Sequence, residues 1–407
     1  LNTLEAMATE TGLRDALLQE LHVLLALSAD AQSVPFDRAA AVRSGLASTE
    51  RLFLAYDDAA SLTSAGRVES LIVDHEAEPG MATVGVQSAV WLRQALNANL
   101  SFGSTRAQVL DAADTAVERG SRVVDTRPDL TAWALAMKSR AHRVRFDDDE
   151  MALAREYATR AEQHLSLAPV ADSTVTAAVI ESNAMVAFAD GDFVAAAELT
   201  EERLATLTNS GVEWDRRSHE ARRDRGYYWA RVDVARALES RTEVYSQQSQ
   251  LWGGMRHRQV AIAAKELVHS QLRSGVEGDC EAGFKLVSDA LTWYEAFTGP
   301  RHQDARRTRG IWCMAACRLS DEWEHAGDHD ASGQLRNDAV AAAQLNVELA
   351  THDDTPERVA TYRSRLAQAL VRAGDPSGVA LLRNTLKVRC GGQRYADPQW
   401  PHADDPL

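Results

Sequence analysis

The chain has 407 residues, of which 45% are hydrophobic and 25% charged, ordinary proportions for a globular protein. A formal net charge of −15 argues against duplex nucleic acid or an anionic membrane as a direct partner. No apolar run approaches the ~20 residues of a membrane-spanning helix, and no signal peptide opens the sequence. The four cysteines form no disulfide framework, so we expect a cytoplasmic protein with reduced thiols.

Helical periodicity dominates from Leu13 to Arg389, and alternating β-type runs are nearly absent. Gly, Pro and Asp/Asn clusters divide the pattern into segments of ordinary helix length. The predicted helices are, in chain order, Leu4–Leu27 (one or two helices), Arg38–Ser44, Thr49–Ala65, Ala82–Leu100, Thr105–Arg119, Asp129–Arg145, Glu150–Leu167, Ser173–Ala189, Phe193–Thr208, Glu213–Arg225, Tyr227–Leu251, Gln259–Arg273, Glu281–Phe297, Asp304–His325, Ala331–Ala350, Thr355–Arg372 and Ser377–Lys387.

Four Gly-Asp dipeptides are the strongest internal signal. They occur at Gly191-Asp192, Gly278-Asp279, Gly327-Asp328 and Gly374-Asp375, at intervals of 87, 49 and 47 residues, and 87 is close to two units of about 44. Each copy lies between two alanine-rich apolar stretches, as expected for stacked helix–turn–helix units. One such hairpin cannot bury its apolar face alone, so neighbouring hairpins must cover one another.

The segment from Asn183 to Ala196 resembles a tetratricopeptide repeat (TPR). Ala184 and Ala196 occupy the small-residue positions where the two helices of that repeat approach closely, and the turn at Gly191 fits as well. The period of roughly 43–49 residues differs from the 34 of the standard repeat and looks like the long-period variants in sensor modules of bacterial regulators. The resemblance implies an all-α, right-handed α-solenoid of about nine stacked antiparallel hairpins. We expect residues 1–80 to form a helical cap, 81–390 the repeat array and 391–407 an extended tail.

The resemblance also implies a function, the binding of a protein or peptide in a concave groove lined by the first helix of each pair. Carried over position by position, it selects basic and polar residues early in the array and acidic ones later, so charge could orient a bound segment. The selected residues are Arg93, Asn97, Lys138, His142, Arg145, Glu181, Asp321, Glu324, Ser364 and Gln368.

Two arginine-rich stretches could bind an anionic ligand. The candidates are Arg216, Arg217, Arg223, Arg306 and Arg307. Acidic residues alternate with them, so ion pairs within each helix are the plainer account, which we favour.

Motifs for catalysis are absent or weak. The sequence has no Gly-Lys phosphate loop, no G-x-G-x-x-G motif after a strand and no G-x-S-x-G nucleophile elbow. Glu266/His269 and Glu322/His325 have the Glu-x-x-His spacing of di-iron helical bundles, but a chain with 12 His yields such matches by chance. We therefore predict no metal site and no cofactor.

Three further patterns have a plain structural interpretation that we favour. Cys313 and Cys317 share a helix face and fit a packing role. The acidic run Asp147–Glu150 fits a helix N-terminus, although a divalent cation was the alternative. Ala41–Leu46 faintly resembles a DNA-binding helix-turn-helix, but the following helix is acidic, so an ordinary hairpin is expected.

The sequence thus predicts a protein- or peptide-binding scaffold or sensor, with no membrane and no direct nucleic-acid contact. Two alternatives stay open: a regulatory subunit or part of a larger signalling or transcription regulator, and an all-α metal-dependent enzyme. The oligomeric state is not specified by the sequence.

Overall fold

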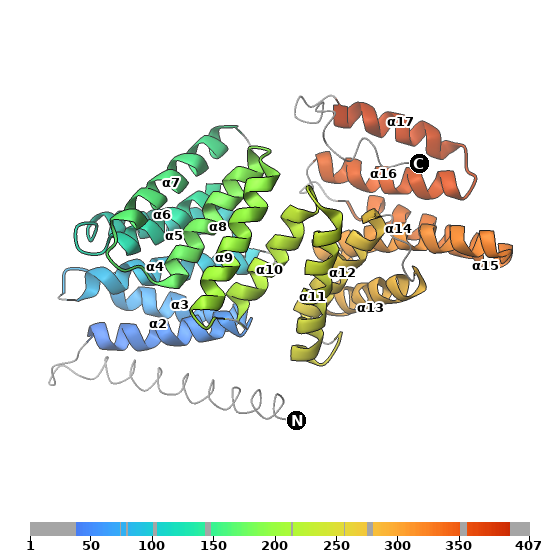
Figure 1. Ribbon diagram of the computed structural model, residues 1–407. Coiled ribbons are helices and arrows are strands. Elements are labelled where there is room, and N and C mark those ends of the chain that lie inside the picture. The colour runs from blue at the N-terminus through green and yellow to red at the C-terminus, as the bar shows by residue number, and fades with distance from the viewer. Residues whose placement is uncertain are drawn as a thin grey trace. The chain divides into compact units, whose positions relative to one another are not determined.

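The computed structural model describes residues 38–390, except 74, 79, 101–103, 143–147, 213–214, 256, 275–279 and 351–355. The described residues form α-helices and no strand (Figure 1). The helices are α2 (Arg38–Leu54), α3 (Asp58–Val73), α4 (Met81–Ala98), α5 (Arg106–Ser121), α6 (Pro128–His142), α7 (Asp148–Leu167), α8 (Ser173–Ala189), α9 (Phe193–Asn209), α10 (Arg216–Trp229), α11 (Val234–Trp252), α12 (Arg258–Ser274), α13 (Cys280–Thr298), α14 (Gln303–Ala326), α15 (His329–Glu348), α16 (Pro356–Arg372) and α17 (Ser377–Cys390). The predicted helix at Leu4–Leu27 and the tail from residue 391 lie outside the described residues.

The chain divides into two compact units, residues 1–233 and 234–407. The described part of unit 1 contains α2 to α10, and that of unit 2 contains α11 to α17. The predicted division into cap, array and tail stays a prediction. Within the described residues, no helix combines the length and the apolar character needed to cross a membrane.

Unit 1 is a stack of antiparallel hairpins, α2/α3, α4/α5, α6/α7 and α8/α9, followed by α10. The first helices also contact one another from hairpin to hairpin, α2 with α4, α4 with α6 and α6 with α8, and so form an inner layer. At the end of the unit α10 packs on α9 and also contacts α2. The stack therefore returns on itself, and the inner layer surrounds a common interior.

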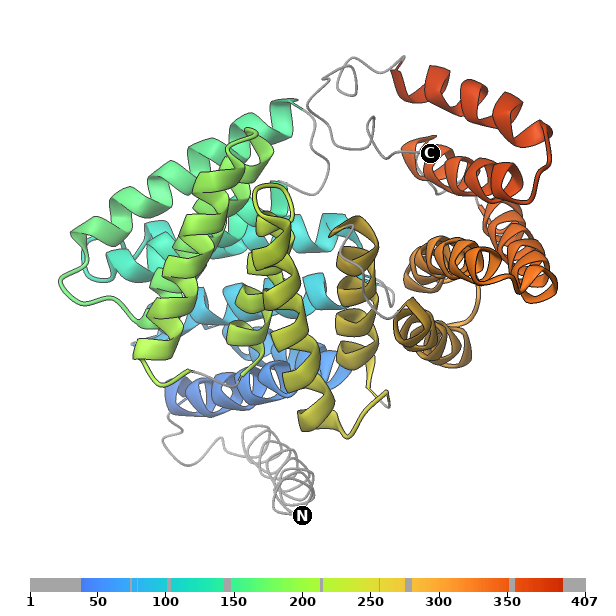
Figure 2. The same ribbon diagram turned by 45° about the vertical axis from the view of Figure 1, so that its right-hand side comes forward.

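Unit 2 repeats the hairpin arrangement in the pairs α12/α13, α14/α15 and α16/α17. Contacts between α12 and α14 and between α14 and α16 again place the first helices in one layer. The last pair lies side by side in both views (Figure 2). Stacked hairpins are thus the building principle in each unit, as the periodicity predicted.

The Gly-Asp turns explain how the hairpins are joined. Gly191, Gly327 and Gly374 have φ between 79° and 87°, the left-handed conformation that ends a helix at lowest cost for glycine. The aspartate that follows each glycine accepts a hydrogen bond from a backbone N–H of the next helix, for example Asp192 from Ala195 N at 3.0 Å. One residue ends the first helix and the next begins the second, so the repeated dipeptide predicted these turns correctly. Gly278-Asp279 lies outside the described residues.

Three other glycines lie within helices, and the predictions that used them as helix ends or breaks were wrong. The expected hairpin around Gly45 is one continuous helix, α2, and the chain turns at Tyr56, whose φ is 61°. The predicted break at Gly226 is absent, because α10 continues to Trp229. Gly120, expected just beyond its helix, lies inside α5, where an added Cβ would come within 3.3 Å of Thr131 Cα. At Gly120 the missing side chain permits α5 to pack closely against α6.

In the core, small residues lie where two helices approach closely, and large aromatic residues fill the space between helices. Ala184 and Ala196 are buried in the α8/α9 pair. Trp91 and Trp133 are buried in the main cluster of unit 1, with ring centroids 5.8 Å apart. Cys313 and Cys317 lie in a hydrophobic cluster of unit 2, so the expected packing role is confirmed.

Candidate functional site

Two cavities lie among the inner helices of unit 1. The first, which we call the arginine cavity, has a volume of about 210 Å³ and is lined by Phe53, Arg93, Gln94, Asn97, Ala98, Arg140, Glu181, Met185, Arg216, Glu220, Arg223, Asp224, Tyr227 and Tyr228. The second, the tryptophan cavity, has a volume of about 270 Å³ and is lined by Arg43, Leu46, Ala47, Glu50, Gln87, Trp91, Arg127, Asp129, Leu130, Trp133, Asp172, Thr174 and Val175. Helices α4, α6 and α8 contribute to both, the first halves of α6 and α8 to the tryptophan cavity and their later parts to the arginine cavity.

The arginine cavity brings together residues that sequence analysis had selected for two different reasons. Arg93, Asn97 and Glu181 were expected on the concave face, and Arg216 and Arg223 were anion candidates. The first three come from α4 and α8 and the last two from α10. The return of α10 toward α2 is what places the two sets around one interior.

Glu181 is the centre of a buried ion-pair network in the wall of this cavity. Arg140 Nη2 lies 2.7 Å from one carboxylate oxygen and Arg203 Nη2 lies 2.9 Å from the other. Arg203 also donates to Asp224 at 3.0 Å. Sequence analysis missed Arg140 and Arg203, since neither stands at the position that the repeat pattern selects.

Arg216 joins α10 to the end of α2. Its guanidinium lies 4.0 Å from the ring centre of Phe53 and donates to the Phe53 carbonyl at 3.1 Å. It also pairs with Asp58 at 2.5 Å and with Glu220 at 2.9 Å. Burial alone would raise the pKa of Glu220, but Arg216 and Arg223 outweigh it and lower that pKa to about 2. The α10 arginines therefore form internal ion pairs, as favoured, although Asp58 as a partner 158 residues away was not foreseen.

Arg93 differs from these paired arginines. Only 1% of it is exposed, and its one hydrogen-bonding contact with the part of the chain that the structure describes is from Nη1 to Met137 Sδ at 3.7 Å. Its Nε has no partner among the described residues. Burial, with a further contribution from Arg140, lowers the pKa of Arg93 to about 9, against an opposing effect of Glu181. The group is still a cation at pH 7.

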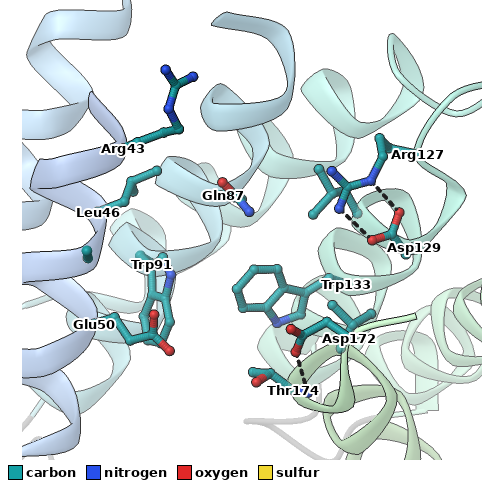
Figure 3. A pocket seen from close by; sticks show the side chains of 13 residues that line it. Arg43, Leu46, Glu50, Gln87, Trp91, Arg127, Asp129, Trp133, Asp172 and Thr174 are labelled. Carbon is teal, nitrogen blue, oxygen red and sulfur yellow. Dashed lines mark hydrogen bonds and ion pairs between the residues drawn. The ribbon is translucent and has the colours of Figure 1, made fainter. Parts of the chain in front are cut away.

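The tryptophan cavity combines aromatic rings with acidic groups (Figure 3). Trp91 and Trp133 line it together with the carboxylates of Glu50 and Asp172. Asp172 accepts a hydrogen bond from Thr174 N at 2.6 Å and so caps α8. Burial raises the pKa of Glu50, Arg217 opposes this, and Asp172 raises it further.

Arg217, near the N-terminus of α10, contacts two residues that line the tryptophan cavity. It lies 3.3 Å from Glu50 and donates to Thr174 Oγ1 at 2.7 Å. It also pairs with Asp215 at 2.6 Å. This anion candidate is thus engaged with carboxylates of its own unit.

The structure turns two other selected residues away from the interior. Lys138 of α6 pairs with Asp114 of α5, and His142 lies 2.7 Å from Glu150 of α7 and stacks on Tyr157. Both are buried between helices. On α6 the residue that faces the arginine cavity is Arg140. Arg145 lies outside the described residues.

The remaining selected residues belong to unit 2. Asp321 accepts from Arg336 at 3.2 Å and Glu324 lies 2.9 Å from His329. Ser364 is buried on α16, and Gln368 accepts from Arg365 at 3.0 Å. Arg306 is buried over the ring of Tyr362, whereas Arg307 is exposed. Arg336 also lies 3.5 Å from Glu324, so Asp321 and Glu324 share one arginine partner within unit 2.

The metal candidates are placed as follows. Glu266 lies 3.6 Å from Arg241, and burial lowers the pKa of His269 to about 3. His325 Nδ1 lies 2.5 Å from the carbonyl oxygen of Asp321. Among the described residues, no group of three His, Cys, Asp or Glu is arranged to hold a metal ion.

Comparison with known proteins gives the fold and no close relative. No known family's sequence profile matches the chain, and no curated protein sequence matches it. Among solved structures, a Rap protein complexed with Competence and Sporulation Factor is 13% identical, with a TM-score of 0.53 over 87% of this chain and 94% of that one. NprR in complex with its cognate peptide NprX is 8% identical, with a TM-score of 0.51 over 76% and 80%.

A third similar structure is a protein with a tetratricopeptide repeat sensor. It is a signal transduction ATPase with numerous domains (STAND) that has a tetratricopeptide repeat sensor, from Pyrococcus horikoshii. It is 10% identical, with a TM-score of 0.51, and covers 96% of this chain and 53% of that one. The chain therefore has an all-α, TPR-like helical-repeat fold, as the sequence resemblance predicted.

Proposed function

We propose that the chain is a binding and sensor module and that the inner helices of unit 1 bind a short peptide or an extended protein segment. The observation that carries this is the arginine cavity, where four helices direct charged and polar groups into one interior. NprR, which shares the fold, has a cognate peptide as its partner. Free thiols at Cys280, Cys313 and Cys317 agree with a reducing compartment, so we place this activity in the cytoplasm.

The size of the cavities favours a peptide over a compact small molecule. Sites for drug-sized ligands usually enclose about 300–1,000 Å³, and the two cavities here measure about 210 and 270 Å³. Each is large enough for a side chain or a chain terminus. Trp133 and Arg140 are seven residues apart on α6, roughly 10 Å along a helix. A segment of about five extended residues is long enough to reach from one cavity to the other.

Asn97 offers the cleanest test, because its side chain lines the cavity and makes no hydrogen bond with the described residues. The full chain is immobilised and exposed to a pool of random pentapeptides, and retained peptides are identified by mass spectrometry and measured singly by calorimetry. We expect Asn97→Ala to weaken binding about tenfold, the loss of roughly one hydrogen bond. Its melting temperature should match that of the parent.

Asn183→Ala is the matched control, since Asn183 lies on α8 of the same unit and reaches only the exposed Glu162, at 3.4 Å. It should bind as the parent does. Retention of no peptide, or equal loss in both variants, would contradict the proposed function.

A second candidate function is that of a sensor part within a larger regulator. The STAND structure supports it, because this chain matches about half of that protein. The reading frame upstream of the sequence decides the question: an ATPase or DNA-binding region fused there supports this candidate, and a start codon at its beginning argues against it.

A further inference from the structure

Arg93 is a buried cation that forms no ion pair with a carboxylate among the described residues of unit 1. Three other buried arginines of the same unit show the usual arrangement, each with two carboxylate partners. Arg119 binds Glu69 and Glu76, Arg203 binds Glu181 and Asp224, and Arg216 binds Asp58 and Glu220. Among the described residues, Arg93 has only the sulfur of Met137. A buried charge without a counter-charge is costly, so a protein retains one where something else compensates it.

The carboxylate that acts electrostatically on Arg93, Glu181, is already shared. Glu181 has one oxygen on Arg140 and the other on Arg203, so both are engaged. Arg140 lowers the pKa of Arg93, which shows that the two cations repel one another across this part of the wall. In contrast, carboxylate neighbours raise the pKa of Arg203 and of Arg216 against the effect of burial. The side of the cavity next to Arg93 therefore carries uncompensated positive charge.

The charge of the lining determines which anion fits. Four arginines and three carboxylates line the cavity, an excess of one positive charge. A singly charged group balances this excess, whereas a phosphate dianion would also be repelled by Glu181, Glu220 and Asp224. A carboxylate matches the planar fork of a guanidinium and can accept two parallel hydrogen bonds from it.

We infer that Arg93 is the receptor for a carboxylate of the bound peptide, either its C-terminus or the side chain of an Asp or Glu. This rests on the proposed function, because it specifies the chemistry of the ligand in the same cavity. Arg93 then acts as a specificity-determining residue, and Asn97, one helical turn further along α4, lies next to it on the same face.

The first test needs no ligand and compares Arg93→Met with Arg203→Met in the full chain. Methionine keeps the apolar stem and removes the charge. Arg93→Met should leave the melting temperature unchanged or raise it, because an unpaired buried cation is removed. Arg203→Met should lower it by roughly 10 °C, because Glu181 and Asp224 lose a partner. An equal fall in both variants would show that Arg93 is structural and would overturn the inference.

The second test uses three pentapeptide pools on the immobilised full chain. Pool one has free C-termini and no Asp or Glu, pool two has amidated C-termini and no Asp or Glu, and pool three has amidated C-termini with Asp and Glu included. Retention of pool one at least tenfold above pool two assigns the carboxylate to the C-terminus. Retention of pool three, with pool one at the level of pool two, assigns it to a side chain. Arg93→Met should abolish either preference, and Arg160→Met, an exposed arginine of α7, should preserve it.

The outcomes separate the two proposals. Equal retention of all three pools overturns the carboxylate inference and leaves peptide binding in place. A carboxylate preference that survives Arg93→Met also overturns it. Retention of no pool overturns the proposed function together with this inference.

Discussion

At the scale of single residues, arginine has opposite roles in unit 1 depending on what surrounds it. Arg216 is buried and holds α10 against α2 through Asp58, Glu220 and the Phe53 carbonyl. Arg93 is even less exposed than Arg216 and forms no ion pair with a carboxylate among the described residues. The first arrangement joins two helices, and the second leaves a buried charge without a paired carboxylate among the described residues.

We predict that Arg216→Met lowers the free energy of unfolding by about 3–5 kcal/mol, because Asp58 and Glu220 would keep their charges without a buried partner. Urea denaturation followed by tryptophan fluorescence measures the effect. Arg160→Met removes an exposed pair with Glu156 and should change stability by no more than about 0.5 kcal/mol. Similar losses in the two variants would show that the bridge from α10 to α2 contributes little.

The candidate site was only partly predictable at this scale. Arg93 and Asn97 were selected because they stand on the first helix of a hairpin, and both line the arginine cavity. On α6 the polar residues at alternate positions are Lys138, Arg140 and His142. The sequence alone does not show which of these side chains faces the interior of unit 1. The structure selects Arg140, since the other two bind partners on α5 and α7. That choice depends on Asp114 and Glu150, whose positions follow from packing between hairpins.

At the scale of helices, several helix ends were predicted from glycines, and some of these predictions were correct and others wrong. A glycine followed by aspartate ends one helix and caps the next, as at Gly191-Asp192. Gly45, Gly120 and Gly226 lack such a neighbour and lie within helices. Gly299 also lacks it but directly follows the end of α13, with a φ of 82°. The local sequence identifies the cap because the cap is a local structure. It does not identify close packing, which depends on the neighbouring helix.

Gly378 of α17 should therefore tolerate no side chain. An added Cβ would lie 2.8 Å from the Ala367 carbonyl oxygen and 2.8 Å from Val371 N, both backbone atoms of α16. We expect Gly378→Ala to destabilise unit 2 by about 1–3 kcal/mol through overpacking. Gly333 of α15 has nothing within 4 Å, so Gly333→Ala should raise stability by up to about 1 kcal/mol. Thermal unfolding of both variants gives the comparison, and a neutral Gly378→Ala would mean that α17 can move away from α16.

At the scale of the whole molecule, the periodic sequence predicts stacked hairpins but not how a stack closes. Each hairpin depends on contacts between neighbours in sequence, which the repeat pattern encodes. The contact between α10 and α2 joins residues about 160 apart and depends on the sum of small rotations along the stack. No local sequence pattern determines the sum of these rotations. The contact that brings α10 back to α2 could therefore not be predicted from the sequence.

Acid should destabilise both units, because each contains at least one histidine whose pKa is lowered by burial. Burial, and to a smaller extent the positive charge of Arg222, lowers the pKa of His219 in unit 1 to about 4. Burial, followed by Arg258, lowers the pKa of His257 in unit 2 to about 4, and its Nδ1 accepts a hydrogen bond from Gln259 N at 3.2 Å. Burial lowers the pKa of His269 to about 3. Between these values and about 6.5 the unfolded chain binds protons that the folded chain does not, so stability falls as the pH falls through this range.

We therefore expect the urea midpoint to decrease from pH 7 to pH 5, because the free energy of unfolding falls by on the order of 1–2 kcal/mol for each of these histidines. Below about pH 4.5 the loss should steepen in unit 1, because Glu220, with a pKa of about 2, is ionised when folded and takes up a proton when unfolded. His257→Asn retains an acceptor for the Gln259 N–H and removes the titration, so it should flatten the decrease. His329→Gln, at an exposed position, should not. A midpoint that is constant from pH 7 to pH 5 would mean that these histidines take up protons without unfolding, and hence that their surroundings admit water in the folded state.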